Sequence, residues 1–358
     1  MNDLKNLSGV EKIEFMFKEG VDFSPTHKKN INIRRFRLIK PRHLFWIPSL
    51  IIKKIYRFLP NLLKDIFFFL SINHKAPKTK MFAKTRYSEI RTLVDIKISA
   101  LILKSVPVEI LDKTKSILKL GFFTSRLESV SKIDTIIDDV LDYATPSHAG
   151  ARPYFKDGKN EQIDGSYSAY YTFSKKDNEK ITSILSKNFD KNFNYYLSAL
   201  AGYRCKFQDI EYSLGIVYGA NSNDEMHQDV YGSVAKGFIY LQDVGENDAP
   251  FELLKGSHLD AVFRSAETNK AVLKNDFHSG GSTRIRGEDL KNSIEKFGIK
   301  SFTGEKGTFI VANTAGFHRK GIHKSNKPRI TLACGVKRKG LIAKLLINLL
   351  ALLKNDKP

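Results

Sequence analysis

The sequence predicts an α+β protein in which helices precede a β-sandwich or jelly-roll barrel. Residues 86–145 place apolar side chains at spacings of three and four, as amphipathic helices do. From about residue 202 the apolar side chains instead form short runs rich in β-branched and aromatic residues, separated by Gly, Asn, Asp and Pro. Apolar residues make up 42% of the 358 residues, which suffices for a buried core and makes a disordered chain a poor description.

The first 85 residues are expected to form a basic, α-helical extension. Lysines, arginines and two prolines interrupt the apolar stretch 44–70, so no charge-free run approaches the ~20 residues that a spanning helix needs. Two short amphipathic helices fit this stretch, with Pro60 near the start of the second. Basic residues beside Trp and Phe suit a helix that lies in a membrane interface. Burial of these helices against the protein itself stays open as the alternative.

The composition restricts the partners and the compartment. The chain carries 59 Lys and Arg against 38 Asp and Glu, a formal charge of +21, which attracts polyanions. The excess is largest between Arg34 and Lys80, where Asp65 is the sole acidic residue, and a solvated face is the alternative to a docking surface there. The sequence contains no recognised nucleic-acid motif and no aromatic platform within the basic run, so a nucleic-acid partner is not expected.

Two cysteines, Cys205 and Cys334, exclude a disulfide framework and a cysteine-based zinc site. Both lie in apolar surroundings, where packing is the expected role. The first 20 residues have no continuous apolar segment and do not match a secretory signal. We therefore expect a cytoplasmic protein, with peripheral contact with a membrane as a further expectation.

Five strands are expected in the second half of the chain, preceded by a helix over 181–198. A polar segment follows the third strand, and we expect it to be an irregular, mobile insertion over an active site, with a Gly-rich stretch at 278–287. The expected strands are 210–220, 234–244, 250–254, 307–313 and 329–336, and the insertion spans 258–300.

A helix is expected over residues 341–354, directly after three basic residues at 337–339. It is apolar around most of its circumference and too short to span a membrane. The protein itself, a second subunit or a lipid surface must cover it. Peripheral membrane contact through 44–70 and 341–354 is one expectation, and a homodimer is the alternative.

The sequence His227-Gln228-Asp229 predicts two metal ligands on one side of an extended segment, because residues two apart on a strand point the same way. His318, just after the expected strand 307–313, is the candidate third ligand. Two imidazoles and one carboxylate leave positions of an iron open for a cosubstrate and O₂. Arg329 begins the last strand and can hold a carboxylate through two hydrogen bonds. The alternative for His318 is a loop histidine that hydrogen-bonds to the backbone, and the alternative for Arg329 is a surface ion pair.

Residues 218–336 resemble the phytanoyl-CoA dioxygenase-like branch of the 2-oxoglutarate/Fe(II) oxygenases. The resemblance lies in the HQD of 227–229, in GFIYLQDVGENDAPFELLKGSH at 237–258, in EKGTFIVANTAGFHRKG at 305–321 and in RITL at 329–332. It implies a double-stranded β-helix, the jelly-roll or cupin-like barrel, with a core at about 202–338 inside an oxygenase domain at 86–338. The extension 1–85 and the helical segment 339–358 lie outside that domain.

The resemblance implies that His227, Asp229 and His318 hold Fe(II) and that Arg329 binds the C5 carboxylate of 2-oxoglutarate. Thr331 lies two residues after Arg329 on the same face of the expected strand, from which it can hydrogen-bond the same carboxylate. The implied reaction hydroxylates an aliphatic C–H of a small-molecule, lipid-linked or glycan-type substrate and releases succinate and CO₂. A catalytically inactive jelly-roll binding protein at a membrane surface is the alternative, and a zinc or other cupin-like metal protein is another.

The chain departs from the family pattern near the predicted site. Ala249 stands where the family usually has Gly, and Asn313 where it often has Asp. His258, which ends the Gly-Ser-His of the second segment, is expected to be a structural turn residue. Tyr218 and Lys236 flank the HQD motif on strands, from which either can reach the cosubstrate.

Overall fold

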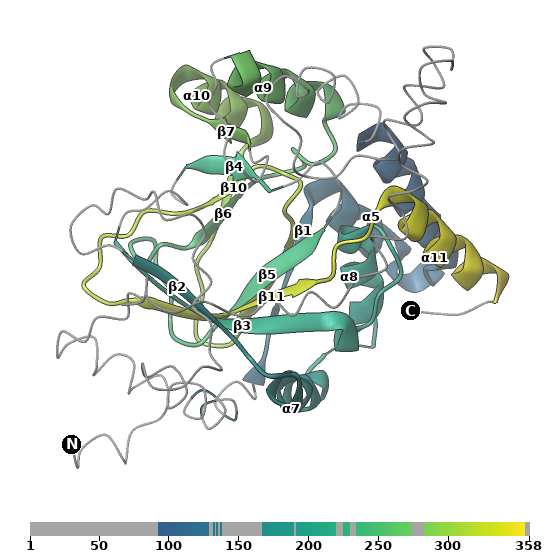
Figure 1. Ribbon diagram of the computed structural model, residues 1–358, viewed down its shortest axis with the longest axis horizontal. Coiled ribbons are helices and arrows are strands. Elements are labelled where there is room, and N and C mark those ends of the chain that lie inside the picture. Colours follow the sequence, from purple (N-terminus) through teal and green to yellow (C-terminus); the bar gives the residue numbers. More distant parts are fainter. Residues whose placement is uncertain are drawn as a thin grey trace, which may run out of the picture.

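Two antiparallel sheets form the body of the protein in the computed structural model (Figure 1). The structure describes residues 92–128, 167–189, 191–219, 225–229, 234–273 and 283–354, with 132, 134 and 137 in addition. The larger sheet has the order β1-β9-β5-β11-β3-β2 and the smaller one the order β7-β4-β10-β6-β8. The strand bounds are β1 Phe122–Arg126, β2 Tyr167–Thr172, β3 Ile210–Tyr218, β4 Met226–Gln228, β5 Ala235–Tyr240, β6 Phe251–Leu254, β7 Thr283–Ile285, β8 Ile299–Phe302, β9 Thr308–Asn313, β10 His318–Lys320 and β11 Arg329–Val336.

The chain passes alternately between the two sheets. Strands β3, β5, β9 and β11 belong to the larger sheet. The strands that follow the first three of them in the chain belong to the smaller sheet: β4 after β3, β6 to β8 after β5, and β10 after β9. Side chains from β5, β6, β8 and β9 pack together between the sheets, among them Tyr240, Phe251 and Phe302. This alternation is that of the double-stranded β-helix, and it confirms the expected α+β fold with a jelly-roll barrel.

Helices cover the outer face of the larger sheet. The largest hydrophobic cluster joins side chains of α5, α7 and α8 to outward-facing residues of the sheet such as Leu214, Ile239 and Leu332. Two further helices lie beside β7 of the smaller sheet, and α11 lies at the edge of the molecule (Figure 1). The helix bounds are α5 Val108–Leu120, α7 Lys175–Ser186, α8 Phe193–Ala201, α9 Ala261–Leu273, α10 Gly287–Phe297 and α11 Leu341–Leu353, with short 3₁₀ helices η4 Leu101–Ser105 and η6 Phe207–Asp209.

Three expectations about elements are corrected by the structure. Residues 122–126 form a strand, β1, because they pair along their full length with β9. The expected helix 181–198 is two helices, and the first begins earlier, at a point where Ser174 accepts a hydrogen bond from the amide of Asp177. The insertion 258–300 is not irregular where it is described, since it contains α9, β7, α10 and the first residues of β8. The expected extension 1–85 and the stretch 278–282 lie outside the described residues.

The C-terminal helix α11 lies where the sequence predicts a helix. Among the described residues, none of the helices is both long enough and apolar enough to cross a bilayer. The division of the chain at residues 85 and 338 stays a prediction.

His258 lies in a tight contact with the end of α5. Gly121 ends this helix in the left-handed conformation, with φ of 85°, and a Cβ placed on it would come within 2.6 Å of the His258 ring. The imidazole Nε2 lies 2.9 Å from the Leu118 carbonyl and donates to it, because a carbonyl can only accept. Burial of the ring lowers the pKa of His258 from 6.5 to about 4. The residue thus joins the β6–α9 turn to α5 as a neutral imidazole.

We expect this histidine to make the protein less stable in acid. Below pH 6.5 the unfolded chain binds a proton at His258, whereas the folded protein binds one only near pH 4. The unfolded state therefore binds more protons, and stability falls as the pH falls through this window, by on the order of 3 kcal/mol in total. Denaturant unfolding at about pH 7 and about pH 4.5 measures the change. A His258→Gln variant should lose less stability over that interval than the wild type, and equal losses would contradict the assignment.

Candidate metal centre

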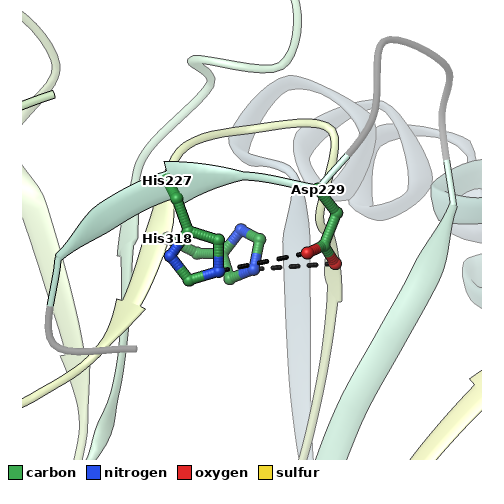
Figure 2. Close-up of side chains that lie close together, drawn as sticks. All are labelled: His227, Asp229 and His318. Atoms are coloured by element: carbon green, nitrogen blue, oxygen red, sulfur yellow. Dashed lines mark ion pairs between the residues drawn. The ribbon is translucent and has the colours of Figure 1, made fainter. Parts of the chain in front are cut away.

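His227 and His318 lie opposite each other on neighbouring strands of the smaller sheet. They are directly opposed in the antiparallel pairing of β4 with β10, so their side chains lie on the same face of the sheet. Their ring centroids are 4.6 Å apart. Asp229 follows His227 by two residues, and Figure 2 shows its carboxylate directed at both imidazoles. One ligand atom from each of the three residues lies within 4.8 Å of the others.

The spacing of the three groups suits a single metal ion. The distance from Nε2 to a carboxylate oxygen of Asp229 is 4.0 Å for His227 and 3.8 Å for His318. Ligands bound at about 2.0–2.2 Å to one ion lie about 3 Å from their neighbours. A movement of each side chain by less than about 1 Å therefore closes the site around an ion.

The hydrogen bonds of the two histidines determine which ring nitrogen faces the site. His227 Nδ1 lies 2.7 Å from the Glu225 carbonyl and His318 Nδ1 lies 2.9 Å from the Gly316 carbonyl. A carbonyl only accepts, so each Nδ1 carries the hydrogen and each Nε2 presents its lone pair to the cluster. Burial of the ring, with His318 beside it, lowers the pKa of His227 to about 3. The imidazole is therefore in the neutral form that binds metals.

The residue between the two ligands of the HQD motif anchors this segment from behind. Gln228 is fully buried; its Nε2 donates to Thr268 Oγ1 at 3.1 Å, and its Oε1 accepts from Arg264 Nε at 3.0 Å. Both partners belong to α9. The Asp229 amide donates to the Thr314 carbonyl at 3.1 Å, which fixes the end of the segment. The polar stretch after residue 258 thus supports the ligands, and the sequence did not reveal this role.

Lys236 approaches the cluster from β5. Its Nζ lies 2.7 Å from Asp229 Oδ2, and its side chain is half exposed. The ammonium group holds one carboxylate oxygen by a charge-assisted hydrogen bond, which limits rotation of the carboxylate. Lys236 therefore contacts a candidate ligand, and its contact with the cosubstrate stays a prediction.

Arg329 lies inside the barrel with an unused donor. It is 2% exposed, its Nη1 donates to the Ala249 carbonyl, and its guanidinium lies 5.2 Å from the centre of the Phe238 ring. Its Nε is buried and has no hydrogen-bond partner among the described residues. Such a donor is costly to bury unless a ligand satisfies it. Thr331 follows on the same face of β11 and donates weakly, at 3.5 Å, to the Gly215 carbonyl.

Two phenylalanines connect Arg329 with the histidines. Phe238 lies 5.4 Å from Phe251, and Phe251 lies 5.7 Å from the His318 ring, measured between ring centroids. They form an apolar wall between the guanidinium and the candidate ligands. No motif in the sequence marks either phenylalanine as a site residue, although both lie inside the segment that carries the family resemblance. Tyr218 packs instead edge-on against His323, with ring centroids 4.9 Å apart.

Ala249 holds the turn that supplies the carbonyl for Arg329. Its φ is 57°, the left-handed region, and its amide donates to the Ile322 carbonyl at 2.9 Å. Glycine enters this region without strain, whereas a residue with a Cβ is strained there. The departure at position 249 is thus a strained residue that still keeps the turn.

No family model matches the chain, and no curated protein matches its sequence. Similar solved structures include the non-heme alpha ketoglutarate dependent carbocyclase SnoK from nogalamycin biosynthesis, at 12% identity over 66% of this chain and 85% of that chain, with a TM-score of 0.41. EctD from S. alaskensis with bound Fe is similar at 10% identity, over 65% of this chain and 80% of that chain, with a TM-score of 0.38. AviO1 from Streptomyces viridochromogenes Tue57 is similar at 10% identity, over 65% and 96%, with a TM-score of 0.36. At such distances the function has to be argued from the chain's own residues.

Proposed function

We propose that this protein is a mononuclear non-haem Fe(II) dioxygenase that uses 2-oxoglutarate as cosubstrate. The observation that carries the proposal is the convergence of His227, Asp229 and His318, with both Nε2 atoms and the carboxylate facing one point. Two neutral imidazoles and a carboxylate on one side of an ion are the donor set of non-haem Fe(II) oxygenases, and they leave the opposite side open. Structural zinc sites, in contrast, use four protein ligands.

The surroundings of the cluster fit the cosubstrate. One carboxylate of 2-oxoglutarate would satisfy the buried Nε of Arg329, with Thr331 on the same face as a further donor. Phe238 and Phe251 line the space between this guanidinium and the imidazoles, so the carbon chain of the cosubstrate would contact apolar surface. A low-dielectric wall also strengthens the ion pair with Arg329.

Bound iron and 2-oxoglutarate together supply the oxidation, in which O₂ is consumed and succinate and CO₂ are released. The chain's own residues bind and orient. The Nδ1 donors to Glu225 and Gly316 keep both imidazoles in one tautomer, and Lys236 holds Asp229 Oδ2. The network of Gln228 with Arg264 and Thr268 keeps the HQD segment in place. The substrate class that we propose is a small molecule or a lipid- or glycan-type molecule with an aliphatic C–H.

The function is tested with full-length protein purified without oxygen and supplied with Fe(II), 2-oxoglutarate and then air. Succinate should form only when all three are present, and Zn²⁺ in place of Fe(II) should give none. Because turnover without the true substrate is slow, 2-oxoglutarate binding is measured in parallel by anaerobic calorimetry. Binding should require the metal. Absence of both succinate and metal-dependent binding would favour an inactive barrel, and metal-dependent binding with zinc alone would favour a zinc protein.

A further inference from the structure

The helix α11 is amphipathic with its polar side turned inward. Lys344, Asn348 and Ala351 are buried, and they lie on one face because their spacing is four and three. The opposite face consists only of leucine and isoleucine, each between 37% and 83% exposed. We call this the leucine face, and its members are Ile342, Leu345, Leu346, Leu349, Leu350 and Leu353. These six side chains form one continuous apolar patch, whereas exposed apolar residues on soluble monomers are mostly scattered singly.

Specific polar contacts fix this orientation of the helix. Lys344 Nζ lies 2.8 Å from Asp95 Oδ1, and both side chains are almost fully buried. Asn348 accepts from the Arg204 amide at 3.0 Å and donates to the carbonyls of Ile98 and Gly202 at 3.3 Å each. Rotation of α11 to bury its leucines would break a buried ion pair and expose polar groups to apolar neighbours, which is strongly unfavourable. The leucine face is therefore held outward by the fold.

Exposed lysines lie at both ends of α11 and on elements next to it, and α11 itself contains no acidic residue. Exposed Lys337 precedes the helix and exposed Lys354 follows it. Lys97 and Lys104 are exposed on the neighbouring helix over residues 92–100 and on η4, which contacts α11. Lys337 has an acidic neighbour, Glu211 at 3.5 Å, but both side chains are about 70% exposed, and such a pair is weak.

We propose that the leucine face docks this protein onto the surface of an anionic lipid bilayer. A leucine-rich face with lysines at its ends matches the two requirements of interfacial helices, which are apolar area for the acyl boundary and positive charge for the headgroups. The helix is about 20 Å long at 1.5 Å per residue, so it lies along the surface. The leucines would be immersed while the lysines stay at headgroup level.

Charge argues against the other candidate occupants. A twofold contact between two copies of α11 would bring Lys354 near Lys337, or near its own copy, without any acidic residue on the helices to compensate. The apolar segment 44–70 of this chain also carries an excess of basic residues, with Asp65 as its only acidic one. An anionic membrane supplies the opposite charge that both protein partners lack.

Flotation of the full-length protein with vesicles tests this proposal. The vesicles contain phosphatidylcholine alone or phosphatidylcholine with about one quarter phosphatidylglycerol. We expect the bound fraction to be at least about tenfold higher with the anionic vesicles and to fall in high salt. The fraction of the double variant Leu346→Gln/Leu349→Gln that binds anionic vesicles should be at least about tenfold lower than that of the wild type. Its thermal midpoint should stay unchanged, because both residues are exposed. Val262→Gln, at an exposed position of α9 away from the leucine face, is the matched control and should bind like the wild type.

Three results would overturn the proposal. The wild type could remain unbound with both kinds of vesicle. The double variant could bind anionic vesicles as well as the wild type, in which case another segment carries the contact. Light scattering could instead show a dimer that the double variant dissociates, without vesicle binding, and the occupant would then be a second copy. Succinate formation is measured separately, so failure of docking is distinguishable from failure of the proposed oxygenase activity.

Discussion

His318→Ala is expected to abolish Fe(II) binding and 2-oxoglutarate turnover. The variant keeps His227 and Asp229 but loses the third donor, which is the imidazole opposite His227. Loss of a partner outside the coordination sphere costs about 10–100-fold in affinity or activity, so loss of a ligand should cost more than about 100-fold. Anaerobic thermal unfolding with and without Fe(II) measures the loss. Wild-type protein should gain about 2.7 kcal/mol at a metal concentration 100 times the Kd, and the variant should gain none.

The matched control is His323→Ala, which removes a histidine that contacts Tyr218 and the Lys327 carbonyl outside the cluster. It should bind Fe(II) like the wild type. The metal-free forms of both variants should unfold near the wild-type midpoint. A His318→Ala variant that binds iron normally, or that loses the same stability with and without iron, would show that His318 is a structural residue.

Arg329→Met is expected to raise the Kd of 2-oxoglutarate by about 100- to 1000-fold and to leave Fe(II) binding unchanged. Removal of one partner from a buried, hydrogen-bonded charge pair costs about 2–5 kcal/mol, and methionine keeps much of the side-chain volume. The Kd of 2-oxoglutarate for Arg329→Lys should lie between the values for the wild type and for Arg329→Met, because an ammonium keeps the charge but lacks the planar pair of donors. Calorimetry with the metal-loaded, oxygen-free protein gives the Kd.

Stability distinguishes this role from a packing role. Without cosubstrate, the Arg329→Met change removes the hydrogen bond to the Ala249 carbonyl and the contact with the Phe238 ring, but it also removes a buried Nε donor without a partner. Because the loss of one hydrogen bond costs about 1–3 kcal/mol and removal of the unpaired donor offsets part of it, the cosubstrate-free variant should lose no more than about 2 kcal/mol of stability. A large loss of stability together with an unchanged Kd for 2-oxoglutarate would show that the guanidinium supports the Ala249 turn alone.

The long strands were visible in the sequence because burial on the barrel gives them unbroken apolar runs. Strand β11 has the predicted bounds, and β3, β5, β6 and β9 lie within the predicted ranges. The strands that were missed depend on partners. Strand β1 is five residues, of which Thr124, Ser125 and Arg126 are polar, and its pairing with β9 determines it. Strands β4, β7 and β10 have three residues each, too few for any periodic pattern.

The residues of the candidate site likewise fall into those that local sequence predicts and those that depend on contacts between distant segments. The spacing of His227 and Asp229 predicts a shared direction from local geometry alone. The position of His318 after an expected strand makes it only a candidate, which the family resemblance supports, because the opposed register of β4 and β10 is a long-range pairing. Phe238, Phe251 and the support of Gln228 by α9 depend on contacts between distant segments. The inward side of α11 was hidden for a similar reason, since Lys344 finds its buried partner in Asp95.

The left-handed residue Ala249 limits which sequences can maintain this barrel. Its position is fully buried, so asparagine and aspartate, which tolerate the left-handed region, would bring a polar side chain into the core. A larger or β-branched side chain at position 249 would clash in the buried site and would also strain the left-handed backbone. Glycine and alanine are therefore the residues that we expect to keep both this backbone conformation and the contact with Arg329.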